Sequence, residues 1–154
     1  MLFSEEVRAA MSALPMGSVL VGTKAFIAES LRWRRAFGGA MRQAGILAAA
    51  CIYGLKHNVD MLTEGHANAR RLAQGLANIG KIAIDPNEVE TNIVVFDIAA
   101  TGMTPAQFVQ RLIKHGVRMS SYRGTAIRAV THMDVGQSYV DQAVSVVARV
   151  LKGD

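Results

Sequence analysis

One arginine stands out because it interrupts an apolar strand pattern. Arg128 lies in the segment AIRAVTH, where side chains alternate between two faces, and its own face also carries Ala126 and Val130. An aliphatic residue is the usual occupant of such a position, and a buried or half-buried guanidinium needs an anionic partner. That partner is either an Asp or Glu of this chain or the carboxylate of a ligand, which a guanidinium binds through two parallel hydrogen bonds. Arg128 is therefore a candidate carboxylate-binding residue.

A second candidate anion site lies in the segment RWRRAFGGAMRQAG, residues 32–45. Three arginines precede Gly38 and Gly39, and Arg42 follows in the expected first turn of a buried helix. Free N–H groups at a helix N-terminus, a glycine turn that allows close approach and a nearby guanidinium together favour phosphate binding. The same pattern also describes a solvated basic helix end closed by an ordinary C-terminal glycine. Both interpretations remain open from the residues alone.

The other residues of types used in catalysis give weaker patterns. His132 could be a ligand or a base, but a lone histidine is more often a hydrogen-bonded structural residue. Cys51 is the single cysteine, so it cannot form an internal disulfide, and its apolar surroundings indicate a packing role. His57, His66 and His115 show no metal-ligand spacing with one another or with the cysteine. The sequence therefore predicts no metal site.

Composition limits the classes of protein to be considered. Hydrophobic residues make up 51% of the 154 residues, which predicts apolar surface meant for a partner and hence an oligomer. The net charge of +5 fits the binding of nucleic acid or of an anionic ligand. Because Trp33 is the one aromatic residue available among the basic residues, nucleic-acid binding is not expected.

The sequence predicts no membrane-spanning segment, because the apolar stretch 44–55 is too short to cross a bilayer. Glu5 and Glu6 stand where a signal peptide has basic residues, which favours a cytoplasmic protein.

The first half of the chain is predicted to be helical with one short strand. The expected elements are a capped helix over residues 4–14, a strand over 17–22, a helix over 23–37, an enclosed helix over 41–57 and a helix over 60–80. The last of these carries one apolar stripe, with Asn68 expected on the opposite face.

The second half is predicted to be a β-α-β-β-α domain. Strands are expected over 91–98, 117–121 and 126–132, and helices over 105–115 and 138–152. Thr104 and Gln107 form a capping-box pattern in front of the first helix, with Pro105 at its first position and Gly116 at its end. The expected fold class is therefore α/β, with a small α+β domain at the C-terminus.

Several long segments together resemble a known family. The segments are MGSVLVG, RWRRAFGGAMRQAGILAAA, HNVDMLTEGHANARRLAQGL, TNIVVFDI and RAVTHMDV. In this order and spacing they resemble the C-terminal half of a low-specificity threonine aldolase, a pyridoxal-phosphate enzyme of the aspartate aminotransferase fold type, fold type I. The resemblance implies an atypical leader over 1–14, a remnant of the large domain with linking helices over 15–85, and the small domain over 86–154.

The resemblance also implies which catalytic group is missing. In the family the cofactor-binding lysine lies in a segment of the form S-K-G-L-G-A-P-V-G-S, and aligning Pro15, Gly17 and Ser18 to it places Ala10 at the lysine position. Lys24, on the far side of the strand, is not expected to replace it. The family cleaves L-threonine or allo-threonine to glycine and acetaldehyde. This chain alone is expected to be inactive, because alanine can neither form the covalent link to pyridoxal phosphate nor transfer protons.

Other positions carry over from the family with roles. The resemblance implies that Arg128 binds the α-carboxylate of a small amino-acid substrate and that Arg42 contacts the cofactor phosphate near a subunit interface. His132 and Asp134 are implied to shape the turn after the strand. The implied partners are a second copy of the chain or a missing N-terminal half, with neither nucleic acid nor membrane. The alternative is a non-catalytic, self-associating domain derived from such an enzyme.

Overall fold

The computed structural model describes residues 20–153 and divides the chain into two compact units, Met1–Leu62 and Thr63–Asp154. The expected leader with Ala10 lies outside the described residues, as does the first half, residues 17–19, of the strand expected over 17–22. The described part of that strand, residues 20–22, has no strand structure. Within the described range, no helix is both long enough and apolar enough to span a bilayer.

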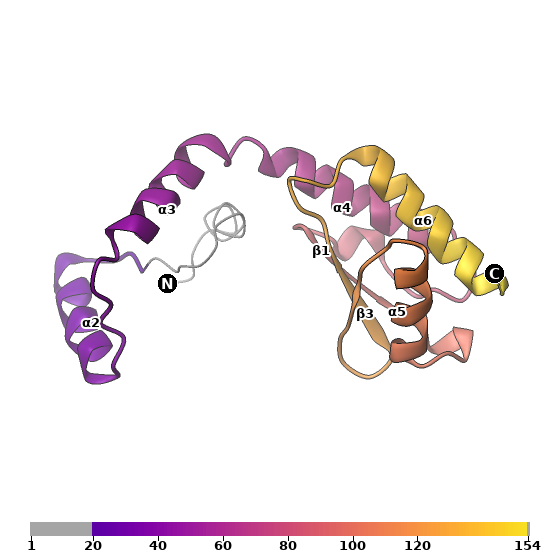
Figure 1. The fold of residues 1–154 in the computed structure, drawn as a ribbon, viewed down its shortest axis with the longest axis horizontal. Coiled ribbons are helices and arrows are strands. Elements are labelled where there is room, and N and C mark those ends of the chain that lie inside the picture. The colour runs from indigo at the N-terminus through magenta and orange to yellow at the C-terminus, as the bar shows by residue number, and fades with distance from the viewer. Residues whose placement is uncertain (1–19, 154) are drawn as a thin grey trace. The chain divides into compact units, whose positions relative to one another are not determined.

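The N-terminal unit contains helices α2 (Lys24–Ala36) and α3 (Gly45–His57) (Figure 1). The side chain of Thr23 caps α2 by accepting a hydrogen bond from the N–H of Phe26 at 3.3 Å, as its position in the sequence predicts. Gly38, with φ +74°, allows the chain to leave that helix. The helix expected from residue 41 begins at Gly45, so the start predicted from the apolar pattern is four residues too early.

The expectation that α3 is enclosed by other elements is wrong for the residues described. Gly54 is the one buried residue among residues 20–62, whereas Ile46 and Tyr53 have 78% and 62% of their surface exposed. A helix that is apolar on all sides needs cover on all sides, and the described elements of this unit leave most of α3 exposed. Much of the apolar surface of residues 20–62 is therefore open to solvent.

The C-terminal unit has the order of elements that the sequence predicts. It contains α4 (Leu62–Ala77, whose first residue lies at the division), β1 (Ile93–Asp97), α5 (Pro105–Lys114), β2 (Ser120–Ser121), β3 (Ala126–Val130) and α6 (Gln137–Lys152), with short 3-10 turns at Pro86–Glu88 and Ala99–Thr101. The strands form an antiparallel sheet in the order β1-β3-β2, with Val95 opposite Arg128. The α/β class is thus confirmed, as is the small α+β domain.

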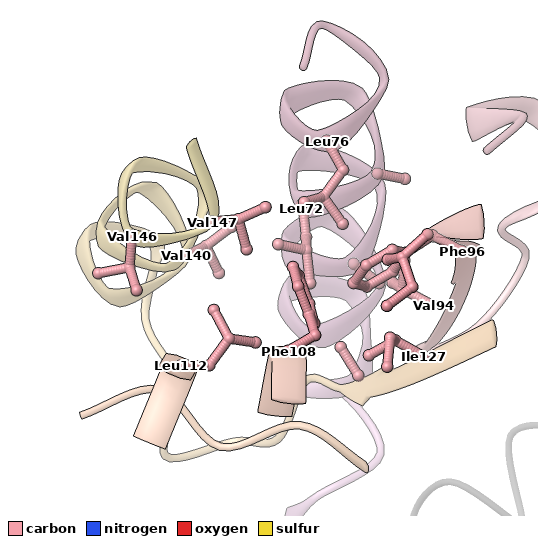
Figure 2. Close-up of a cluster of buried hydrophobic side chains, with 14 of the residues drawn as sticks. Leu72, Leu76, Val94, Phe96, Phe108, Leu112, Ile127, Val140, Val146 and Val147 are labelled. Carbon is pink, nitrogen blue, oxygen red and sulfur yellow. The ribbon is translucent and has the colours of Figure 1, made fainter. Parts of the chain in front are cut away.

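One face of this sheet is covered by the three helices and forms the core. Figure 2 shows Leu72 and Leu76 of α4 and Val140 and Val147 of α6 converging on side chains from α5, β1 and β3. Phe96 of β1 and Phe108 of α5 meet edge to face at 6.2 Å between ring centroids. Arg71 of α4 and Asp141 of α6 add an exposed pair, with Nε–Oδ1 and Nη2–Oδ2 distances of 2.6 and 2.9 Å. The opposite face of the sheet carries no helix of this unit.

The capping box predicted for α5 is confirmed. The N–H of Gln107 donates to the Thr104 hydroxyl at 3.3 Å, and the Thr104 N–H donates to the Gln107 side-chain oxygen at 3.0 Å. Gly116, with φ +80°, ends the helix, while the Val117 N–H donates to the carbonyl of Leu112. These local signals fix the length of α5 and hence the position of the β2 strand that follows.

Helices α4 and α6 approach closely at Gly75, which gives a testable prediction. A Cβ added at Gly75 would lie 2.6 Å from Cγ2 of Val144, so Gly75→Ala should lower the free energy of unfolding by about 1–3 kcal/mol. Val144→Ala makes room, and the double variant should lose less stability than the two single losses added together. Gly65→Ala, on the same helix with open space around it, is the matched control and should not destabilise. Additive losses in urea denaturation would contradict the close contact.

Asp97 joins the end of β1 to the start of β3 and gives a pH-dependent prediction. The Thr125 hydroxyl and the Ala99 N–H donate to its carboxylate at 2.5 and 2.7 Å, and these hydrogen bonds lower the pKa of Asp97 below its ordinary value. A lowered pKa stabilises the fold at neutral pH, and this contribution is lost as the pH falls below about 4, the ordinary pKa of an Asp, and through the lowered pKa of Asp97. Asp97→Asn should cost about 1 kcal/mol at neutral pH and should reduce the loss of stability on acidification. Identical acid dependence of both proteins in urea denaturation would contradict this role.

Candidate functional site

Arg128 lies in the middle of the central strand of the sheet. Its backbone is opposite Val95 of β1 on one side and Ser120 of β2 on the other. Its side chain is exposed, whereas Ile127 and Ala129 point into the core. The expectation of a buried or half-buried guanidinium is therefore wrong, because the helices cover the other face of β3. Among residues 20–153, no carboxylate forms an ion pair with it.

The surroundings of Arg128 on this face are apolar. Val95, Ile93 and Val130 share the face, and each has between 40% and 47% of its surface exposed. The Ser120 hydroxyl donates to the carbonyl of Arg128 at 3.2 Å and ties the two strands together. An exposed guanidinium in an apolar setting can orient a carboxylate through two parallel hydrogen bonds. The attraction between the two charges becomes stronger when a covering surface excludes water. The face therefore combines a guanidinium that has no ion-pair partner among residues 20–153 with exposed apolar side chains.

A set of buried hydrogen bonds holds the end of β3 beside Arg128. The Thr131 hydroxyl donates to the carbonyl of Gly65 in α4 at 2.9 Å, and the Asn92 side chain donates to the carbonyl of Thr131 at 3.0 Å. Asn68 donates to the carbonyl of Val135 at 2.9 Å and is buried, so its predicted place on the outer face of α4 is wrong. The sequence signal that could have identified this anchor is the position of Asn68, a polar residue directly beside the apolar stripe of α4.

His132 and Asp134 lie in the turn that these anchors position. The His132 Nδ1 and the Asp134 Oδ2 are 3.6 Å apart, and the Asp134 side chain is almost fully exposed. Asp134 also lines an apolar groove of about 540 Å³ between the segment after α5 and the start of α6. This placement fits the expected role in shaping the turn. The structure thus brings His132 and Asp134 together in the turn after β3, whereas Arg128 lies in the middle of that strand.

Arg42 belongs to the N-terminal unit and is exposed. It lies in the turn before α3 and not in the first turn of that helix, because the helix begins at Gly45. No side chain caps α3, and its first turn has no acidic residue, so its N-terminal N–H groups have no side-chain acceptor among the described residues. Lys24, which is not expected to replace the family's lysine, begins α2, and Ala10, at the expected place of that lysine, lies outside the described residues.

Comparison with known proteins assigns the family. The family model of the beta-eliminating lyases matches residues 11–101, which is more than half of the chain. The chain belongs to the beta-eliminating lyase family. Within this family, it is 33% identical over 132 residues to low-specificity L-threonine aldolase 1 of Arabidopsis thaliana and 35% identical over 131 residues to the low specificity L-threonine aldolase of Escherichia coli K12. In both comparisons the match covers 85% of this chain and 37% of the relative.

A solved structure supports the fold of this beta-eliminating lyase family member. The structure of MppP soaked with the product 2-ketoarginine has a TM-score of 0.55 at 16% identity, covering 70% of this chain and 33% of that chain. The recognition of a threonine aldolase-like chain is thereby confirmed at the level of the family and the fold. The chain spans somewhat over a third of the length of the curated relatives that it matches.

The family depends on pyridoxal phosphate, so the described residues can be tested for a fit to this group. Arg42 and Arg128 are exposed cations, and Arg128 does not line the groove of about 540 Å³ in the C-terminal unit. An enclosed site for an aromatic ring needs apolar walls and a few convergent polar groups around one cavity. Arg128 lies outside the groove of the C-terminal unit, so the described residues of this unit do not bring that guanidinium and the walls of a cavity together and do not by themselves fit the cofactor. In the same residues, no group of three His, Cys, Asp or Glu side chains could hold a metal ion.

Proposed function

We propose that this chain supplies the carboxylate-binding part of a threonine aldolase-like lyase and does not cleave substrate by itself. The observation that carries the proposal is Arg128, an exposed guanidinium at the centre of an uncovered apolar sheet face. The substrate class is a small β-hydroxy amino acid such as L-threonine or allo-threonine, with glycine and acetaldehyde as products. The reaction is proposed to take place in the cytoplasm.

The proposed role of Arg128 follows from its chemistry. A guanidinium holds the two oxygens of an α-carboxylate at once and thereby fixes the orientation of the amino acid, which a lysine ammonium does less well. Val95, Ile93 and Val130 keep the surrounding surface apolar, so a covering domain would remove water from the pair. Arg42 is proposed to contact the phosphate of the cofactor.

The proposed dependence on another polypeptide rests on two features. Ala10 stands where the resemblance places the lysine, and alanine has no amine to link the cofactor. The open apolar surface of α2, α3 and the sheet face also needs cover. We therefore propose that the lysine and the rest of the site come from a segment, encoded in the same gene or in another chain, that is equivalent to the part of the relatives that the match leaves out.

Mixing and complementation test this proposal. The full chain with pyridoxal phosphate should show no visible absorption band that survives desalting and is removed by borohydride. Co-expression with the unmatched part of the Escherichia coli relative should give a complex that cleaves threonine, detected as acetaldehyde. A stable complex that neither binds glycine nor releases acetaldehyde would contradict the proposed role, and a persistent reducible band on the chain alone would contradict its dependence on a partner.

A second candidate is a non-catalytic, self-associating domain. It is favoured by the large apolar side chains exposed on α2 and α3, which are Phe26, Leu31, Trp33, Ile46, Ile52, Tyr53 and Leu55. Such surface is stable in water when a second copy covers it. In sedimentation velocity, Ile46→Ser combined with Ile52→Ser should then dissociate the oligomer, while Ile113→Ser, at an exposed position of α5, should not. A monomeric parent chain would exclude this candidate.

A further inference from the structure

The outer edge of β1 has free backbone hydrogen-bonding groups. The sheet order places β1 at an edge. At the two ends of the β1–β3 pair, the Ile98 N–H donates to the carbonyl of Thr125, and the Thr131 N–H donates to the carbonyl of Asn92. The even-numbered residues of the segment 92–98 are therefore the ones whose backbone groups bond to β3. In an antiparallel pair the alternate residues then direct their N–H and C=O groups away from the partner strand. Ile93, Val95 and Asp97 are these residues.

A fourth strand begins at this edge and stops after one residue. Ala83 and Asp97 exchange two backbone hydrogen bonds, at 2.9 and 3.0 Å. The chain then leaves the edge, because Asp85 caps the 3-10 turn Pro86–Glu88 through the N–H of Asn87. Next along the edge, the outward N–H and C=O of Val95 have no backbone partner within residues 20–153. The outer hydrogen-bond ladder of β1 is therefore formed at Asp97, by Ala83, and is unpaired at Val95 within the described residues.

A groove runs along the open part of the ladder. Its volume is about 460 Å³, and its walls include Ile84, Asp85 and Glu88 on one side and Ile93, Val95 and Ala126 on the other. Asp97 also lines it, and no Lys, Arg or His does. The Asp97 carboxylate is occupied by Thr125 and Ala99, whereas the Glu88 side chain makes no ion pair among the described residues. The groove combines unpaired backbone groups, apolar side chains and negative charge.

We propose that this edge of β1, with the groove beside it, docks an extended basic segment of a partner polypeptide. The segment adds to the sheet as a strand, and its backbone completes the hydrogen bonds that Val95 leaves open. Alternate apolar side chains of the segment lie against Ile93 and Val95, and its Lys or Arg side chains approach Asp85 and Glu88. The proposal does not depend on the carboxylate site, because Arg128 lines no part of this groove.

Binding of a synthetic peptide to the full chain tests the proposal. The probe is a labelled peptide of about eight residues with alternating valine and lysine, followed by fluorescence anisotropy. Val95→Pro removes the outward N–H and leaves the bonds to β3 intact, since proline is accepted at an edge strand when its nitrogen faces outward. It should weaken binding roughly tenfold. Glu88→Gln should weaken binding a few-fold, and Glu90→Gln, an exposed acid outside the groove, should leave it unchanged.

Peptide variants keep the test decisive even if Val95→Pro unfolds the protein. Two peptides carry N-methyl groups on one or the other set of alternate amides. Each blocks one edge of the extended peptide, so the peptide whose docking edge is blocked should lose binding. A peptide with glutamate in place of lysine should also lose binding. Equal binding of the parent, N-methylated and acidic peptides would overturn the proposal. So would self-association of the chain through this edge, seen as a dimer that Val95→Pro dissociates while the basic peptide fails to bind.

Discussion

Arg128→Ala should lower kcat/KM for threonine cleavage by the complemented enzyme about 10- to 100-fold, because hydrogen bonds between a charged group and its partner contribute about 1.5–3 kcal/mol. The fold should be unaffected, since the guanidinium is exposed and makes no ion pair among the described residues. The binding of glycine should weaken by a similar factor, because glycine carries the same carboxylate. The measurements are acetaldehyde release and glycine titration of the complex.

Two further variants separate the carboxylate contact from charge in general. Arg128→Lys keeps the positive charge but loses the two-point geometry, so its activity should lie between those of the parent and Arg128→Ala. Arg149→Ala removes an equally exposed cation from α6, far along the chain from the sheet face, and should leave the kinetics unchanged. If Arg128→Ala and Arg149→Ala lower kcat/KM equally and Arg128→Lys keeps the activity of the parent, Arg128 acts only through net charge and does not hold the substrate.

Phe108→Ala should lower the free energy of unfolding of the C-terminal unit by about 3–5 kcal/mol. The ring has no exposed surface and meets Phe96 edge to face (Figure 2), so its removal opens a cavity at the centre of the core. A loss of this size is a large part of the stability of a small domain. Urea denaturation followed by circular dichroism measures it.

The matched control lies on the same helix. Ile113 has 50% of its surface exposed, and Ile113→Ala should change the free energy of unfolding by less than about 1 kcal/mol. Phe108→Leu fills part of the cavity and should lose clearly less stability than Phe108→Ala. A similar, small loss in all three variants would show that the side chain of Phe108 does not hold the helix on the sheet.

Local signals predicted the elements of the C-terminal unit well. The ends of α5 follow from Thr104, Gln107 and Gly116, which act within one helical turn of their own positions. The start of α3 was misplaced because no polar capping residue precedes it, and the apolar pattern alone does not mark where the helix begins. Helix ends were thus predicted accurately where a capping residue or a terminal glycine marks them.

The orientation of Arg128 could not be predicted locally. Alternation assigns the residues of AIRAV to two faces, and both faces contain apolar residues. Helices α4, α5 and α6 pack against Ile127 and Ala129, and this packing determines which face of β3 is buried. The same tertiary packing buries Asn68. The family resemblance assigned a role to Arg128, whereas only the packing shows that its side chain is exposed.

The two edges of the sheet differ in length, and this difference limits how copies of the molecule can stack. β1 has five residues, whereas β2, at the opposite edge, has two. For a fibril to grow by strand pairing, each copy that is added must have a second long edge strand with which the following copy can pair. The short serine pair of β2 does not offer one. Strand pairing at β1 therefore ends after a single addition, which protects a chain with so much apolar surface from unlimited polymerisation through its sheet.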